Sequence, residues 1–253
     1  MLNIFKAIES EGFTEYTLKA IDKFSNEIEN GYTNISRFTL QEHAGICKGG
    51  EVLIGASVVA SYATRGLATS SNAGSGQDSP TSWQIDERQE HLIELWAKAS
   101  HRWIENSEQI LTEHIGAKIA QGAESKVYYR EGDTSVIKER VSIYSTTQKA
   151  LDAIIIHNYL FPETAMRVIA FTRDSDGLFR IILTQPYIRC QRLATKDEID
   201  TLITAKGFQI DLSNPIESYI SDRIILEDMH PANVFIDEIT NKAICIDCIA
   251  KFK

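Results

Sequence analysis

The chain has few of the residues that mark disulfide-stabilised or membrane proteins. It contains 4 cysteines and 5 prolines among 253 residues. Scattered thiols of this number do not make a disulfide framework, so we expect reduced cysteines. The longest apolar stretch, residues 52–63, is much shorter than a membrane span, and no basic segment leads into an apolar run near Met1. We therefore expect a cytoplasmic protein without a membrane partner.

Positive charge is also scarce. The chain has 26 lysines and arginines against 35 aspartates and glutamates, a formal net charge of −9. Nucleic-acid binding needs positive patches to neutralise phosphates, so the balance argues against a surface built for nucleic acid. A local basic groove remains compatible with this composition.

Two of the cysteines, Cys245 and Cys248, form a Cys-x-x-Cys pair inside an apolar run. No second pair completes a tetrahedral zinc site, so the sequence favours small buried residues over metal or redox use. His157 follows three isoleucines in a segment with helical character. We expect it to be a packed helix residue and not a proton carrier.

The first half of the chain predicts helices. Apolar spacing predicts a helical amino-terminal region over residues 1–65, in which residues 52–63 form a buried helix. Gly, Ser and Asn dominate the stretch that follows, which predicts a flexible linker over 66–84. A helical lead-in over 85–115 comes next, with an amphipathic helix over 86–105 and a short one that starts at Ser107.

The amphipathic helix carries Trp96 and Trp103 on one face, with Leu92 and Ala99. Such stripes usually pack into a core, and we favour packing onto the neighbouring domain. The alternative is a docking face through which the chain forms an oligomer.

The remainder, residues 116–253, predicts a mixture of short strands and helices, so the expected fold class is α+β. Predicted strands lie at 126–130, 135–138, 167–172 and 179–183, and predicted helices at 146–160, 196–206 and 215–221.

Three polar residues near the end of the chain have the spacing of a phosphoryl-transfer site. Asp228 precedes Asn233 by five residues, and Asp247 follows fourteen residues later at the end of an apolar run. Asp228 would orient or deprotonate an attacking hydroxyl, while Asn233 and Asp247 would hold Mg²⁺ against the phosphates of ATP. His230 would brace the loop by donating a hydrogen bond. The alternative is a turn with capping side chains, because Asp and Asn favour turns.

Residues 121–128 are similar to the glycine-rich loop that covers nucleotide phosphates, with Gly122, Ala123 and Ser125 in the loop. Lys138 ends a Ser-Val-Ile-Lys strand that resembles the strand of the phosphate-binding, catalytic lysine. A solvated lysine at a strand edge is the alternative. The helix after this strand has no glutamate, so Asp152 is the candidate partner for Lys138.

An interlobe hinge is predicted at residues 183–187. If Thr184 takes the gatekeeper position beside the nucleotide pocket, the Gln185 carbonyl and the Tyr187 N–H would hydrogen-bond adenine, and Pro186 lies where no donor is required. A strand that simply ends at a proline explains the same residues.

The motif Asp-Met-His-Pro-Ala-Asn at residues 228–233, with Ile-Asp at 246–247, resembles the aminoglycoside-phosphotransferase branch of the protein-kinase-like superfamily. Residues 85–253 are most similar to kinase-like domains of polyvalent proteins on bacterial mobile elements. This resemblance implies a minimal two-lobed kinase-like domain at 116–253, with an antiparallel-sheet amino-terminal lobe and a truncated carboxy-terminal lobe.

The same resemblance implies an ATP- and Mg²⁺-dependent phosphotransferase with an unknown acceptor, protein or small molecule. A nucleotide-binding pseudokinase or interaction module and a nucleotidyl transferase are the alternatives. Six residues follow Asp247, so we expect residues 1–115 or a second molecule to pack beside the Asp228 loop and complete the acceptor site.

Overall fold

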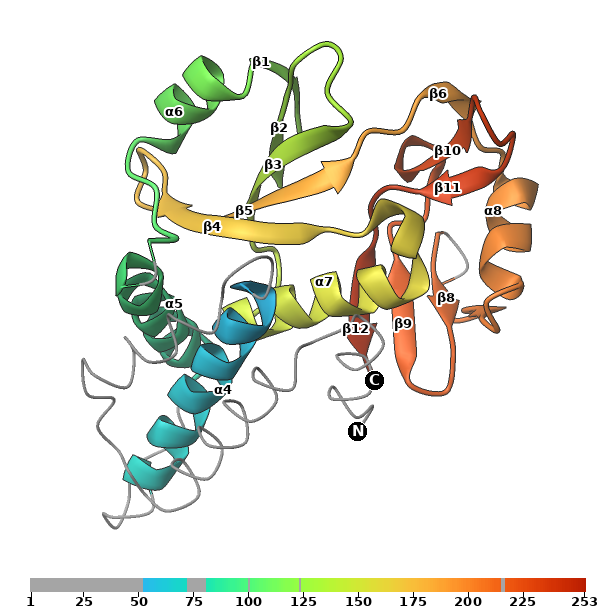
Figure 1. The fold of residues 1–253 in the computed structure, drawn as a ribbon. Coiled ribbons are helices and arrows are strands. Elements are labelled where there is room, and N and C mark those ends of the chain that lie inside the picture. The colour runs from blue at the N-terminus through green and yellow to red at the C-terminus, as the bar shows by residue number, and fades with distance from the viewer. Residues whose placement is uncertain (1–51, 72–80, 100, 123, 215–216) are drawn as a thin grey trace, which may run out of the picture.

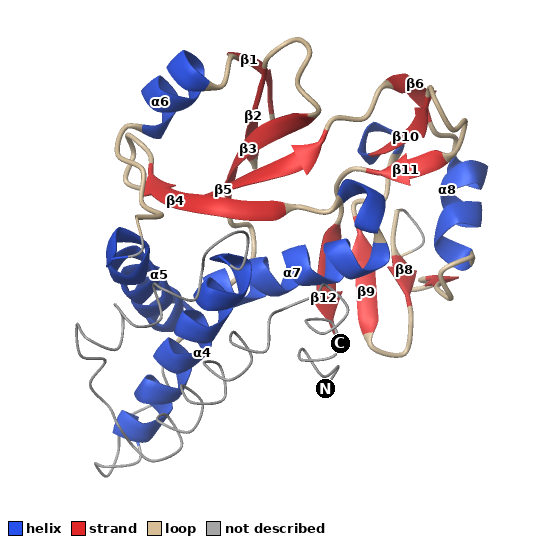
Figure 2. Ribbon diagram, viewed as in Figure 1, coloured by secondary structure: helices blue, strands red, loops and turns tan. Residues whose placement is uncertain are grey.

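The structure is a computed structural model that describes residues 52–71, 81–99, 101–122, 124–214 and 217–253. These residues form an α+β arrangement of antiparallel sheets and helices (Figures 1 and 2), as the sequence predicts. The helices are α4 (Val52–Ser71), α5 (Ser82–Ala99), α6 (Ser107–His114), α7 (Thr147–Leu160) and α8 (Lys196–Thr204). None of the helices in these ranges has the length and hydropathy needed to cross a bilayer.

The first sheet has five strands in the order β1-β2-β3-β5-β4, all antiparallel. Its strands are β1 (Ala117–Gln121), β2 (Ser125–Tyr129), β3 (Ser135–Val141), β4 (Arg167–Arg173) and β5 (Phe179–Pro186). The four predicted strands are confirmed: those at 126–130 and 135–138 pair as β2 and β3, and those at 167–172 and 179–183 pair as β4 and β5. The short helix predicted from Ser107 is also confirmed as α6.

Helix α7 connects β3 to β4 and packs in the centre of the first core (Figure 1). It begins where the Thr146 hydroxyl accepts a hydrogen bond from the Lys149 N–H, a standard N-cap. It ends before Pro162, which starts the short 3₁₀ helix η2 (Pro162–Thr164). Apolar residues lie on most sides of α7 because it is covered by the sheet and by other helices.

Helices α4 and α5 cover α7 and β4. The buried helix predicted over residues 52–63 is confirmed, but α4 extends to Ser71 and α5 begins at Ser82. The linker predicted at 66–84 is therefore wrong at both ends. Small residues such as Gly66 and Ala68 weaken the apolar signal without preventing a helix. Helix α5 also ends at Ala99, earlier than the predicted boundary at 105.

The tryptophan face is part of the core. Trp96 is fully buried and meets the Phe171 ring edge to face, with ring centres 6.3 Å apart. Trp103 is partly buried, packs on Phe179 and forms a bridge with β4. The packing interpretation is confirmed, because Trp96 and Trp103 lie against β4 and its neighbours, whereas an oligomer through this face stays a prediction.

The second part of the structure contains two small antiparallel sheets and α8 (Figure 2). One has the order β11-β10-β6 and the other β12-β9-β8-β7. Their strands are β6 (Cys190–Leu193), β7 (Gln209–Ile210), β8 (Tyr219–Ile220), β9 (Ile224–Glu227), β10 (Val234–Asp237), β11 (Ala243–Cys245) and β12 (Ile249–Phe252). They enclose a second core with α8.

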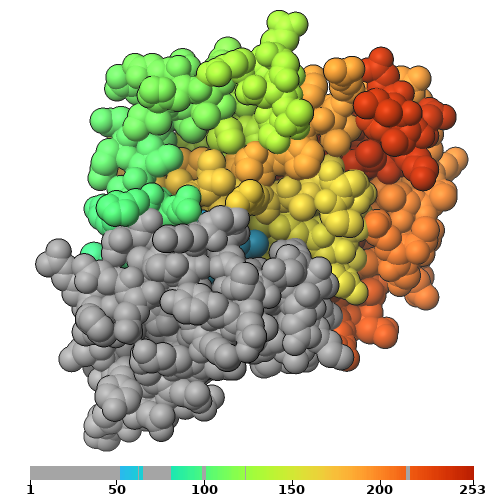
Figure 3. All heavy atoms as spheres, in the orientation of Figure 1, coloured from blue at the N-terminus to red at the C-terminus, as the bar shows by residue number. Residues whose placement is uncertain are grey.

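Helix α8 is close to the helix predicted at 196–206. The helix predicted at 215–221 is wrong where the structure describes it, because Tyr219 and Ile220 form β8. The yellow atoms of α7 lie beside the orange and red atoms of this second part (Figure 3). Residues 1–51 of the predicted helical region lie outside the described ranges.

The described part of residues 1–115 does not pack beside the Asp228 loop. Helices α4 and α5 contact α7 and β4 on the first core, whereas Asp228 follows β9 in the second part. The sequence-based prediction of an acceptor platform made from these helices is therefore wrong for α4 and α5. Their apolar faces are used to cover α7.

Candidate active site

The loop that carries Asp228 begins where strand β9 ends at Glu227. Asp228 has φ = 62°, in the left-handed region that Asp and Asn tolerate better than other non-glycine residues. The 3₁₀ helix η3 (Pro231–Asn233) then turns the chain into β10. As a result, the Asp228 carboxylate stays at the surface, with 41% of the side chain exposed.

Two side chains of the same loop hold this carboxylate. The Asn233 Nδ2 donates to Asp228 Oδ2 at 2.8 Å and to the Asp228 main-chain oxygen at 2.9 Å. The His230 Nδ1 accepts a hydrogen bond from the Ala232 N–H at 3.1 Å, so the Nε2 carries the proton in a neutral ring. That Nε2 lies 3.4 Å from Asp228 Oδ1. His230 therefore braces the loop as predicted, but it does so by accepting a hydrogen bond from Ala232 and not by the donated one that was predicted.

Asp247 lies in the segment between β11 and β12 and faces two cations. Its Oδ2 is 3.7 Å from the Lys138 Nζ, and its Oδ1 is 3.3 Å from an Arg140 guanidinium nitrogen. The Ile246 N–H donates to the Asn233 main-chain oxygen at 2.9 Å. The backbones that carry Asn233 and Asp247 are therefore neighbours, and strand β3 supplies both positive charges.

The charges around Asp247 change its acidity. Burial raises the pKa of the carboxyl, but Arg140 and Lys138 outweigh burial and bring the pKa below its ordinary value. Burial also lowers the pKa of Lys138, although Asp247 opposes this effect. The carboxylate is therefore held ionised between two cations.

The loop between β1 and β2 lies over this site. The Gly122 N–H donates to the Ser125 carbonyl at 2.9 Å, which closes a tight turn. A Cβ atom at Gly122 would meet nothing within 4 Å, so packing does not require a glycine there. The Ser125 hydroxyl oxygen is buried and has no hydrogen-bond partner within the described ranges. Ala123 lies outside the described residues.

Arg140 is a site residue that the sequence analysis missed. Successive side chains of a strand alternate between faces, so Arg140 shares the face of Lys138. Besides Asp247, it contacts Glu124 of the β1–β2 loop, with 3.5 Å between Nη2 and Oε2. Burial raises the pKa of Glu124, and the nearby Asp247 and Asp228 carboxylates raise it further. Arg140 opposes this by lowering the pKa. The sequence feature that could have identified Arg140 is its position two residues after Lys138 in the same predicted strand region.

The predicted pairing of Asp152 with Lys138 is wrong. Asp152 accepts a hydrogen bond from the Gln148 side chain at 3.0 Å, one helical turn earlier. Gln148 in turn contacts Ser61 of α4 through its side chain. Helical geometry rotates Asp152 away from the Ala150–Ile154–His157 side of α7. Burial raises the pKa of Asp152, because no cation compensates for it.

The backbone groups predicted to bind adenine at residues 183–187 are paired with β3. Opposite residues of an antiparallel pair alternate between those that exchange two hydrogen bonds and those that exchange none. The Tyr187 N–H donates to the Thr134 carbonyl at 2.9 Å, so Tyr187 belongs to a hydrogen-bonded pair. Gln185 lies two residues earlier, opposite Val136, and therefore belongs to a pair of the same kind. The backbone groups of Gln185 and Tyr187 therefore face β3, and the prediction that they bind adenine is wrong.

The Gln185 side chain has a structural position instead. It is buried, and its Nε2 donates to the Thr164 carbonyl at 2.7 Å and to the Ile246 carbonyl at 2.9 Å. The same residue thus connects β5 with η2 and with the segment of Asp247.

Comparison with known proteins assigns the family. No curated protein matches the chain. A family model described as "Serine/Threonine/Tyrosine Kinase found in polyvalent proteins" matches residues 86–253, which include every site residue described above. Because the match covers more than half of the chain, this protein belongs to the family of kinases found in polyvalent proteins.

Proposed function

We propose that the chain is an ATP- and Mg²⁺-dependent phosphotransferase that acts on a hydroxyl group of a protein or small molecule. One observation carries this proposal. The Asp247 carboxylate lies between Lys138 and Arg140, on a backbone bonded to that of Asn233, while Asp228 stays exposed in the same loop as Asn233. Family membership supports the reaction class.

The donor set fits a magnesium nucleotide. Asn233 uses its amide hydrogens on Asp228, so its side-chain oxygen is the group left for a hard cation, together with the Asp247 carboxylate. Lys138 and Arg140 are positioned to offset phosphate charge. The partnerless Ser125 hydroxyl and the Gly122 turn supply groups of the kind that contact phosphate oxygens.

The residues divide the chemistry between them. Asp228 accepts the proton of the attacking hydroxyl, and the Asn233 amide and the His230 ring hold the carboxylate in place for this step. Lys138 and Arg140 stabilise negative charge on the transferred group. Asn233 and Asp247 would hold Mg²⁺, which would supply further neutralisation of phosphate charge.

The register of β5 suggests where adenine binds. If Gln185 and Tyr187 face β3, the Pro186 carbonyl and the Ile188 N–H face the other way. An acceptor and a donor two residues apart suit the edge of a purine. In this arrangement the first sheet and α7 form one lobe, and the β6–β12 part forms a truncated second lobe.

A second candidate is a nucleotide-binding module without transfer activity. It is favoured by the partners of Lys138, which are Asp247 and the Ile246 carbonyl instead of an acid on α7 within the described ranges. Kinases require the lysine and the helix acid to pair for activity. Slow hydrolysis of ATP by the wild type would reject this candidate.

The test is thermal unfolding of the full chain with ATP and Mg²⁺, with ATP and chelator, and with Mg²⁺ alone. Ligands that bind the folded state raise its stability by mass action. We expect a rise in Tm with ATP and Mg²⁺ together and a much smaller one with chelator. Equal shifts in the two ATP samples would contradict the metal-dependent site.

The mobile-element setting belongs to the same proposal. The family description places such kinases in polyvalent proteins, and we propose that this chain is a factor transferred or expressed with mobile DNA.

A further inference from the structure

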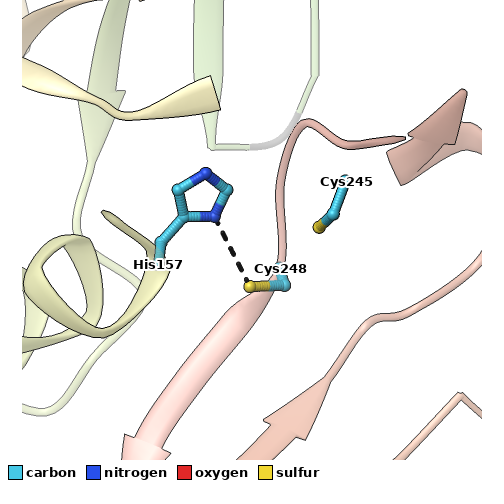
Figure 4. A group of neighbouring side chains, drawn as sticks. All are labelled: His157, Cys245 and Cys248. Carbon is cyan, nitrogen blue, oxygen red and sulfur yellow. Dashed lines mark hydrogen bonds between the residues drawn. The ribbon is translucent and has the colours of Figure 1, made fainter. Parts of the chain in front are cut away.

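Three potential metal ligands meet behind the Asp247 segment. His157 comes from α7, Cys245 ends β11, and Cys248 directly precedes β12. All three residues are buried, and their ligand atoms lie within 4.8 Å of one another. Figure 4 shows a nitrogen of the His157 ring directed at the Cys248 sulfur. The Cys245 side chain lies on the same side of the His157 ring as Cys248. The nearest nitrogen and sulfur are 3.7 Å apart.

The surroundings determine which ring nitrogen is free. The His157 Nε2 is 3.2 Å from the Thr164 carbonyl oxygen, which can only accept a hydrogen bond. It is also 3.2 Å from the Thr164 hydroxyl, whose hydrogen goes to the Cys245 carbonyl at 2.6 Å. Nε2 therefore carries a proton, which leaves the Nδ1 lone pair directed at Cys248. Metal-binding histidines usually donate the N–H of the other ring nitrogen to a carbonyl or carboxylate, which fixes the tautomer and the orientation of the ring.

The separations suit a zinc ion. Zn–N and Zn–S bonds of about 2.0 and 2.3 Å at tetrahedral angles place nitrogen about 3.6 Å from sulfur and two sulfurs about 3.8 Å apart. The His157–Cys248 separation of 3.7 Å already has this value. The Cys245 Sγ lies within 4.8 Å of both other ligand atoms and donates to the Asp247 main-chain oxygen at 3.1 Å, a hydrogen bond that metal binding would replace. Small rotations of the side chains would therefore complete the set.

A fourth ligand can come from the solvent. A cavity of about 20 Å³ lies between β3 and α7 and is lined by His157 and Cys248, with Arg140, Tyr144 and Ala153 among its other walls. This volume is close to what one ordered water requires. Three protein ligands and one water is a common zinc coordination.

We propose that His157, Cys245 and Cys248 form a binding site for a zinc ion. Zn²⁺ with two thiolates and a neutral imidazole has no net charge, so its burial avoids the large cost of an uncompensated ion. The Cys-x-x-Cys motif is incomplete in the sequence because its third ligand comes from a distant helix. The ion would connect α7 to the two residues that flank Ile246 and Asp247.

The test uses the full chain purified without chelator. Elemental analysis should find about one zinc per chain, as three protein ligands around one ion require. Replacement of zinc by Co²⁺ should produce sulfur-to-metal charge transfer in the near ultraviolet and strong tetrahedral bands in the visible. Removal of the metal should lower the Tm by about 5 °C or more, because binding energy contributes to folding.

Variants separate this site from other thiols. Cys248→Ser and His157→Gln should lose the cobalt bands and most of the zinc, whereas Cys190→Ser, which replaces an exposed cysteine, should keep both. The wild-type cobalt spectrum remains decisive if a variant fails to fold. A reduced wild type that takes up neither metal would overturn the proposal. So would zinc retained by a folded Cys248→Ser, or a Cys245–Cys248 disulfide in place of metal. These measurements do not depend on phosphotransfer.

Discussion

Asp228 and Asp247 have the same side chain but neighbours of different charge. Asp228 receives hydrogen bonds from a neutral amide and lies near an imidazole, and 41% of its side chain is exposed. Asp247 lies between a lysine and an arginine, and 23% of its side chain is exposed. Neutral donors orient a carboxylate, whereas two neighbouring cations also favour its ionised form. This difference supports the proposed division, in which Asp228 takes the substrate proton and Asp247 holds the metal ion.

The largest effect on stability should come from Asp247→Asn. This change leaves Lys138 and Arg140 close together and partly buried without their counter-charge, so we expect a loss of about 3 kcal/mol in unfolding free energy. Asp228→Asn is the matched control, because Asn also tolerates a positive φ, and its cost should stay below about 0.5 kcal/mol. Urea unfolding measures both. Equal losses would remove the distinction between the two aspartates.

An intermediate effect is expected for Asn233→Ala. The change removes the two hydrogen bonds to Asp228 and a proposed metal ligand. Stability should fall by about 1 kcal/mol, and the Mg²⁺-dependent part of ATP binding should weaken. Titration calorimetry with and without Mg²⁺ measures the second effect. Unchanged metal dependence would exclude Asn233 from the metal site.

Acid should reveal the pairing of Asp247 with its two cations. The pKa of Asp247 in the folded chain lies below its ordinary value because Arg140 and Lys138 outweigh burial. A lowered folded pKa stabilises the fold above the unfolded value of about 3.9 and loses this contribution as pH falls toward the folded pKa. Asp247→Asn should therefore flatten the stability curve below about pH 4. A wild-type slope in Asp247→Asn would contradict the pairing.

The smallest effect is expected for Asp152→Asn. Burial raises the pKa of Asp152, and its hydrogen bond comes from Gln148 and not from Lys138. Asn removes a costly buried charge, so stability should stay within about 0.5 kcal/mol and nucleotide binding should not change. Loss of nucleotide binding in this variant would restore Asp152 as the partner of Lys138.

Features that depend on the spacing of neighbouring residues were predicted correctly. The strands of the first sheet, α7 and the loop of Asp228 and Asn233 are of this kind, and the structure contains each of them. The linker boundary failed because small residues such as those before Ser71 carry little apolar periodicity in either a helix or a coil.

Tertiary register explains the errors at the site. Asp152 has a suitable charge, but its rotation around α7 depends on packing against α4 and the sheet. The adenine-binding groups predicted at Gln185 and Tyr187 were wrong because the pairing of β5 with β3 decides which backbone groups are free. Arg140 was identifiable only once Lys138 was known to face Asp247.

The most direct test of the division between the two aspartates combines two assays on one set of proteins. Mg·ATP binding by calorimetry and transfer of the γ-phosphate, to protein or water, are measured for the wild type, Asp228→Asn and Asp247→Asn. We expect Asp228→Asn to bind Mg·ATP within about threefold of the wild type while transfer falls by about 10²–10⁴-fold. Asp247→Asn should lose both. Wild-type transfer by Asp228→Asn, or full Mg·ATP binding by Asp247→Asn, would contradict this account.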